Sequence, residues 1–197
     1  MDYRDEYEKI TGAIVEEHRQ VFKRLDMEQL RVFVEAVAAA KRVFVMGGGR
    51  EGISCRGFAM RLAHLGKEAH WIWDDTAAAM GPGDVFVVSE GCGDVGMFRY
   101  VLEKAKRTGA KIAMITGMPE GDSVRKYADI LLFVHSTVYM GQALNAPKQY
   151  DVVPTEQPMG NQFEQHLYML LDVISIFVMR EMGQCYEEME KRHRNVE

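Results

Sequence analysis

Five short, almost uninterrupted apolar runs constrain this chain more than any other feature. They cover residues 43–46, 69–73, 85–88, 112–115 and 130–134. Runs without polar alternation are typical of strands that are buried on both faces, as in a parallel sheet. Helical segments separate the later runs, at about 51–66, 95–109 and 121–128. Strands that alternate with helices indicate right-handed βαβ units. The pattern therefore predicts an α/β fold, a three-layer αβα sandwich around a five-stranded parallel sheet.

The flanking segments complete a single predicted domain over residues 1–197. Its parts are a helical arm at 1–40, the sheet with its crossover helices at 41–135, an active-site loop at 136–160, and a long helix with a tail at 161–197. The loop is irregular and contains three prolines, and a connection of that length is typical of functional loops. Gly183 is expected to end the long helix.

Composition limits the function classes that remain. The chain has 24 Lys and Arg against 29 Asp and Glu, a net charge of −5, which argues against a nucleic-acid-binding protein. No run of about 18 apolar residues predicts a membrane span, and no apolar segment near the N-terminus predicts a signal peptide. Three widely spaced cysteines fit no disulfide framework and no zinc site. We expect a cytoplasmic protein without a membrane partner.

Two glycine-rich segments each follow an apolar run and precede a helix. The first, Gly47 to Gly52, matches the G-x-G-x-x-G pattern, and Asp74 and Asp75 lie at the distance of a ribose-binding acid in dinucleotide sites. The second runs from Ser89 to Asp94. A dinucleotide site needs only the first loop, and the chain has no room for a separate substrate domain. Two such turns at the carboxyl ends of parallel strands instead predict one crevice for a compact ligand.

Longer motifs give a specific resemblance. Segments 58–66 (FAMRLAHLG), 157–165 (QPMGNQFEQ) and 188–197 (EMEKRHRNVE) resemble those of the sugar isomerase (SIS) family, most closely the 6-phospho-3-hexuloisomerases. The resemblance implies an SIS-domain architecture of flavodoxin- or Rossmann-like type. It also implies isomerisation of a sugar or sugar phosphate through an enediol, without a cofactor. The implied assembly is a homotetramer in which the tail reaches a neighbouring site.

The resemblance also assigns site residues. Glu164 corresponds to the family glutamate and is the expected base, although a carboxylate in a first helical turn also answers the helix dipole. His193 is expected to open the ring or transfer protons, unless it is a solvated tail residue, and His64 is expected to be structural. No metal ligands are expected. The predicted substrate-binding residues are Gly47, Gly49, Arg50, Glu51, Ser89, Glu90, Cys92, Gly93, Asp94, Gln157 and Asn161.

The ligand loops depart from the family pattern. Glu51 replaces the serine of the first loop, and Glu90 and Cys92 replace the two serines of the second. A carboxylate about 4 Å from a phosphate charge would repel it by about 4 kcal/mol at an effective dielectric constant near 20. Three hypotheses follow: a neutral, acidic or sulfonated sugar as substrate, carboxylates that pair with Arg50, Arg56 or Arg99, or a carbohydrate-binding protein without activity. A reactive Cys92 and a carboxylate metal site are less favoured alternatives.

Overall fold

The computed structural model describes residues 2–140 and 151–196 and contains the predicted parallel sheet. The strands are β1 (Arg42–Gly47), β2 (Glu68–Trp71), β3 (Val85–Ser89), β4 (Lys111–Thr116) and β5 (Ile130–Phe133). All pairings are parallel, in the order β2-β1-β3-β4-β5. The strand order therefore reverses between β1 and β3, because β2 is added on one side of β1 and the later strands on the other. Open α/β sheets bind ligands at such a switch point.

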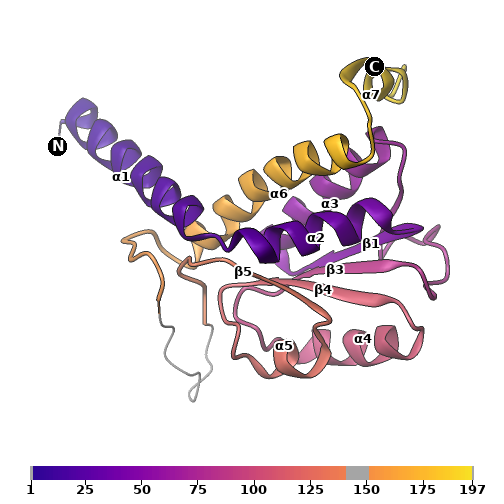
Figure 1. Cartoon of the computed structure of the whole chain (residues 1–197). Helices are drawn as coiled ribbons and strands as arrows, with labels where there is room; N and C mark the ends of the chain where they lie inside the picture. The colour runs from indigo at the N-terminus through magenta and orange to yellow at the C-terminus, as the bar shows by residue number, and fades with distance from the viewer. Residues whose placement is uncertain (1, 141–150, 197) are drawn as a thin grey trace.

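Helices cover both faces of the sheet, which confirms the three-layer αβα prediction (Figure 1). One layer contains α2 (Met27–Ala39), α3 (Gly49–His64) and α6 (Asn161–Glu181), and the other contains α4 (Gly96–Arg107) and α5 (Asp122–Tyr127). Alternate residues of β1 serve the two layers: Val43 and Val45 pack with the first, Phe44 and Met46 with the second. Burial on both faces explains why the strands read as continuous apolar runs.

The N-terminal arm is helical and consists of two helices. α1 (Tyr3–Arg24) ends at Leu25, and the Asp26 carboxylate begins α2 by accepting hydrogen bonds from the backbone of Glu28 and Gln29. An aspartate at this position satisfies amide groups that have no partner within the helix. α2 packs on the sheet, whereas α1 projects away from the body (Figure 1).

The C-terminal part follows the prediction except at its tail. α6 ends at Met182, and Gly183 takes a positive φ of 61° with its amide on the Arg180 carbonyl, as a glycine after a helix commonly does. A short helix, α7 (Tyr186–Lys191), lies within the segment that the sequence analysis treated only as a tail. Part of the predicted active-site loop, residues 141–150, lies outside the described residues. No helix among those described is both long and apolar enough to span a membrane.

Two glycines bring the second glycine-rich loop against the turn that precedes α5. A Cβ atom on Gly121 would lie 2.3 Å from the Gly93 carbonyl oxygen, so the backbones can approach this closely only without a side chain. Gly93 also has a φ of 68°. The Ser123 amide donates to the same Gly93 carbonyl and fixes the loop there.

We therefore expect Gly121→Ala to lower the free energy of unfolding by about 1–3 kcal/mol, the usual cost of forcing extra volume into a packed site. Gly12→Ala is the matched control, because nothing lies within 4 Å of the position that its Cβ would take. Alanine there should raise the stability of α1 by about 0.5–1 kcal/mol. Urea unfolding measures both changes, and an unaltered stability of Gly121→Ala would contradict the close contact.

Candidate active site

The two glycine-rich loops lie side by side at the carboxyl ends of adjacent strands. Gly47, the last residue of β1, is in register with Ser89, the last residue of β3. Gly47 has to be a glycine at this turn, because a Cβ there would lie 2.8 Å from the Glu51 carbonyl carbon, whereas Gly49 has open space and a φ of 50°. The second loop is anchored to the turn after β4, since the Gly117 amide and the Thr116 hydroxyl donate to the Gly91 carbonyl. These bonds hold the second loop in place beside the first, where the sequence predicts a crevice.

Glu51 reaches from the first turn of α3 to the second loop. Its carboxylate accepts a hydrogen bond of 2.6 Å from the Ser89 hydroxyl and one of 3.1 Å from the Gly91 amide. We call these two donors the anion site. Burial raises the pKa of Glu51 to about 7, and the charge of Glu164 adds to this shift, although the bonds from Ser89 and Gly91 oppose it. The hypothesis that Glu51 pairs with an arginine is not supported: its described partners are Ser89 and Gly91.

The other acidic residues of the second loop, Glu90 and Asp94, bind partners near the start of α4. Glu90 is buried, and its carboxylate accepts a hydrogen bond from the Val95 amide at the start of α4. Burial raises the pKa of Glu90 to about 7, helped by the charges of Asp94 and Glu51. Asp94 forms a two-pronged ion pair with Arg99, so the arginine-pairing hypothesis holds for this residue. Burial raises the pKa of the Cys92 thiol, and the charges of Glu90 and Glu51 raise it further. The raised pKa disfavours a reactive thiolate.

Three predicted site residues meet where the first loop faces the beginning of α6. Arg50 Nη1 donates to Asn161 Oδ1 at 2.5 Å and lies 2.9 Å from Glu164 Oε2. Arg50 is half exposed, whereas the Glu164 side chain is only 19% exposed. Gly160 precedes them with a φ of 76°, and a Cβ there would lie 2.5 Å from the Tyr139 backbone nitrogen. The family-like segment before α6 therefore sets the position of the expected base.

Glu164 and Arg50 border a groove beside α1, which we call the α1–α6 groove. It encloses about 530 Å³ and is lined by both residues together with His18, Ser54, Tyr168 and Met169, among others. The opposite charges of Arg50 and Glu164 lie at one end, while the wall formed by α1 and the exposed side of α6 is largely apolar. A sugar-sized molecule fits this volume, with its polar edge toward the Arg50–Glu164 pair.

Two residues of α1 contribute to this region without having been predicted. Glu17 accepts hydrogen bonds from Thr155, Gln157 and Gln162. The arm therefore holds the side-chain amide of Gln157, a predicted substrate-binding residue. His18 lines the groove, with Nε2 3.1 Å from Gln165 Oε1 and its ring stacked on His166. Neither residue belongs to a motif, because α1 reads as an ordinary amphipathic helix. Only its packing against α6 shows their relevance.

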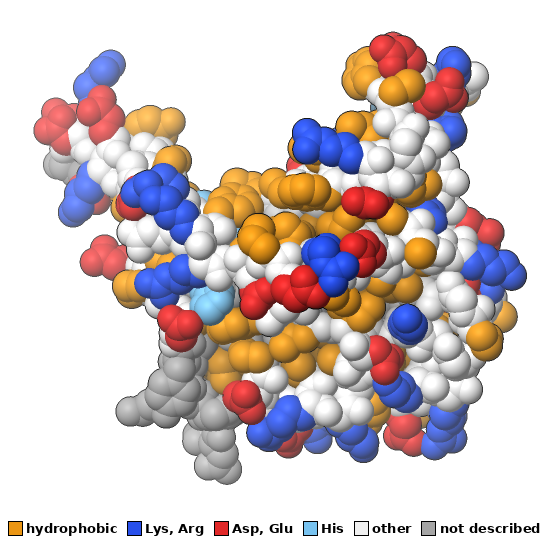
Figure 2. All heavy atoms as spheres, viewed as in Figure 1, with side chains coloured by type: hydrophobic (Ala, Val, Ile, Leu, Met, Phe, Trp, Pro, Cys, Tyr) orange, Lys and Arg blue, Asp and Glu red, His pale blue; other side chains and the backbone are white. Residues whose placement is uncertain are grey.

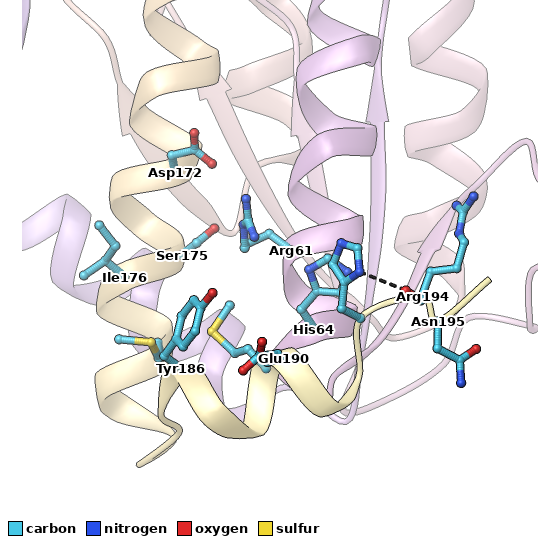
Figure 3. Close-up of a pocket in the computed structure, with 12 residues that line it drawn as sticks. Arg61, His64, Asp172, Ser175, Ile176, Tyr186, Glu190, Arg194 and Asn195 are labelled. Atoms are coloured by element: carbon cyan, nitrogen blue, oxygen red, sulfur yellow. Dashed lines mark hydrogen bonds between the residues drawn. The ribbon is translucent and has the colours of Figure 1, made fainter. Parts of the chain in front are cut away.

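His193 lies in a different pocket, which we call the tail pocket (Figure 3). It encloses about 680 Å³, and α3 contributes Arg61 and His64, α6 contributes Asp172 and Ser175, and α7 and the tail contribute Glu190 and Asn195. The His193 and His64 rings lie 5.1 Å apart. Glu164 lies in the first turn of α6, whereas the tail pocket lies along the later half of this helix, from Asp172 to Met179. At 1.5 Å per residue, these two pocket residues are about 12 and 22 Å along the helix from Glu164. One chain therefore does not bring the two predicted catalytic residues together.

Metal and dinucleotide sites receive no support from the geometry. Among residues 2–140 and 151–196, no three His, Cys, Asp or Glu side chains gather closely enough to hold a metal ion. The Asp74 carboxylate, the candidate ribose acid, accepts hydrogen bonds from the amide and hydroxyl of Thr76. It thus stabilises the turn after β2. The chemistry that remains is that of a carboxylate beside a guanidinium group at one end of a groove.

Comparisons with known proteins identify relatives of this chain. No family model matches the chain. The 3-hexulose-6-phosphate isomerase of Mycobacterium gastri is 30% identical over 174 residues, which cover 88% of this chain and 83% of that protein. The protein of the same name from Bacillus subtilis is 28% identical over 172 residues, 86% of this chain and 88% of the relative. A crystal structure from Methanococcus jannaschii, described as inferring a 3-hexulose-6-phosphate isomerase function, has a TM-score of 0.74 at 25% identity and covers 98% of this chain and 99% of that one.

Proposed function

This chain belongs to the 3-hexulose-6-phosphate isomerase family of sugar isomerase (SIS) proteins and is a sugar-phosphate isomerase, and from this premise we propose that it moves the carbonyl group of a hexulose phosphate between C2 and C3. The support for this reaction is the Arg50–Glu164 pair at 2.9 Å, at the end of the α1–α6 groove.

The pair supplies the two groups that the reaction needs. Glu164 takes the proton from the carbon next to the carbonyl group, and the electrons of that C–H bond form the double bond of an enediol. The Arg50 guanidinium group stabilises the negative charge that develops on the enediolate oxygen. Glu164 then returns the proton to the former carbonyl carbon, while a proton passes between the two oxygens. Product and substrate are isomers, so no redox cofactor takes part.

Isomerisation in deuterium oxide tests this proposal directly. The protein is incubated with fructose 6-phosphate and, separately, with fructose, and NMR spectroscopy follows the appearance of the 3-ketose and the loss of the C3 proton signal. We expect exchange at C3 with the phosphate ester, because an enediol intermediate releases that proton to Glu164 and then to solvent. If neither substrate showed exchange at C3 or formed a new ketose, the proposal would be contradicted.

We propose that the protein assembles as a homotetramer. α1 exposes Tyr3, Tyr7 and Ile10, and α6 exposes Ile176 and Phe177; Figure 2 shows hydrophobic side chains along α6 and beside α2. Contiguous exposed apolar side chains of this kind commonly mark protein interfaces. Light scattering is expected to give four times the chain mass of 22.4 kDa, and Tyr7→Glu with Ile10→Glu should reduce it. A monomeric mass for the unaltered protein would contradict the assembly.

His193 requires such an assembly to take part in catalysis, because it lines the tail pocket and not the groove that contains Glu164 of the same chain. We propose that the tail pocket of one subunit faces the Glu164 site of another. Glu164→Gln and His193→Gln proteins should each be weakly active, and mixing them after dissociation should restore up to a quarter of the activity. Hybrid tetramers would contain sites with both native residues. His70→Gln, on the edge strand β2, is the matched control, and full activity of His193→Gln would contradict the shared site.

We also place the protein in the cytoplasm, where thiols remain reduced. All three cysteines are free: Cys55 is buried, Cys92 partly buried and Cys185 exposed. Burial and the nearby Glu51 charge raise the pKa of Cys55, so this thiol stays protonated and unreactive. Fractionation of the source cells would test this location.

A further inference from the structure

Glu51 places a carboxylate in the anion site between the two glycine-rich loops. The Ser89 hydroxyl and the Gly91 amide, at 2.6 and 3.1 Å, are the kind of donors that such loops offer to an anionic ligand. A Cβ on Gly91 would lie 3.0 Å from Glu51 Oε1, so a side chain there would crowd this approach. The site is thus already occupied by a carboxyl group of the protein itself.

The surroundings of Glu51 do not compensate a second negative charge. The titratable groups that act on it or feel its charge are Glu164 of α6, Glu90 and Cys92 of the second loop, and Cys55 of α3. The nearest arginine in sequence, Arg50, is bound to Asn161 and Glu164. A phosphate group that entered the anion site would therefore have to displace Glu51 and would meet three carboxyl groups.

A sugar hydroxyl group meets no such obstacle. A hydroxyl can donate a hydrogen bond to the Glu51 carboxylate, which leaves the bonds from Ser89 and Gly91 intact. Glu51 remains partly exposed, so a ligand can reach its outer side. A phosphate charge that is buried here without a partner would be costly. A hydroxyl group instead donates a hydrogen bond that the Glu51 carboxylate accepts, so the site favours the neutral group.

We propose that Glu51 is a specificity-determining residue that changes the preference of the anion site from a phosphate group to a neutral hydroxyl group. The substrate's phosphate then lies outside this site, and the hydroxyl-bearing part of the sugar lies against Glu51. This inference rests on the proposed function only in taking the ligand to be a sugar. It concerns how the sugar is oriented and which sugars are selected.

Calorimetric binding of inorganic phosphate, fructose 6-phosphate and fructose tests the inference without any turnover. Glu51→Ser removes the resident carboxylate and leaves the Ser89 and Gly91 donors free. We expect it to bind inorganic phosphate at least about 100-fold more tightly than the unaltered protein and to lose affinity for fructose. Glu51→Gln, which keeps the shape and removes only the charge, should gain about 10-fold. It also keeps the test valid if Glu51→Ser fails to fold.

Glu103→Ser, on the exposed side of α4, is the matched control and should bind all three probes as the unaltered protein does. Equal phosphate affinity in the unaltered protein and in both Glu51 variants would overturn the inference, as would the absence of phosphate binding by all of them. If the Glu51 variants gain phosphate affinity while no sugar is isomerised, the inference stands and the proposed function fails. If the protein isomerises a sugar but the Glu51 variants bind phosphate no more tightly, the proposed function stands and the inference fails.

Discussion

Glu164→Gln is expected to lower kcat by about 10²–10⁴-fold, the range that a positioned general base contributes. Glutamine keeps the length of the side chain and can still accept a hydrogen bond from Arg50, but it cannot take a proton from carbon. The KM should change much less than kcat, because the groove and Arg50 remain in place. Steady-state kinetics with the substrate that the exchange experiment identifies measures both parameters.

Glu181→Gln is the matched control for this variant. It lies at the other end of the same helix, away from Arg50, and forms part of the surface between α2 and α6. Its kcat should equal that of the unaltered protein. If Glu164→Gln retained full activity and its C3 exchange rate, Glu164 would not be the base, whatever its position beside Arg50.

The free energy of unfolding should decrease as the pH rises from 5 to 8. Glu51 and Glu90 have pKa values of about 7 in the folded protein, against an ordinary value of 4.5. Between these values the folded state binds more protons than the unfolded state, so the stabilisation present below pH 4.5 is lost as the pH passes 7. A shift of this size corresponds to about 3 kcal/mol for each group at 1.36 kcal/mol per pH unit.

Urea unfolding at pH 5 and pH 8 measures this difference. Glu51→Gln and Glu90→Gln should each remove part of it, because glutamine does not titrate, and both variants should be more stable than the unaltered protein at pH 8. The exposed Glu103→Gln serves as the control and should keep the full difference. A free energy of unfolding that is unchanged between the two pH values would contradict the burial of both carboxyl groups.

The sheet could be predicted from sequence because its signal is local. Each strand is an apolar run whose burial on both faces leaves no polar alternation, and each helix has its own apolar face. The break between α1 and α2 depends on one capping residue, Asp26, within a segment of uniformly helical character. The short α7 lies in a charged segment whose pattern does not distinguish a helix from a tail.

The sequence placed candidate residues on the two glycine-rich loops, but it did not indicate which partners their side chains bind. Sequence placed Glu51, Glu90 and Asp94 near the ligand loops, and three different partners decide where they point: Ser89 with Gly91, the Val95 amide, and Arg99. The role of Glu17 could not be predicted either, because its partners lie about 140 positions away in the chain.

The hydrogen bonds of Glu17 make the projecting first helix part of the site's framework. Its carboxylate holds Gln157 and Gln162, which flank the Gly160 turn that sets the direction of Glu164. A chain trimmed to begin at α2 would leave both amides without this acceptor and would remove one wall of the groove. A protein that is shortened at α1, or a fusion that displaces its first residues, is therefore expected to have an altered candidate active site as well as an altered arm.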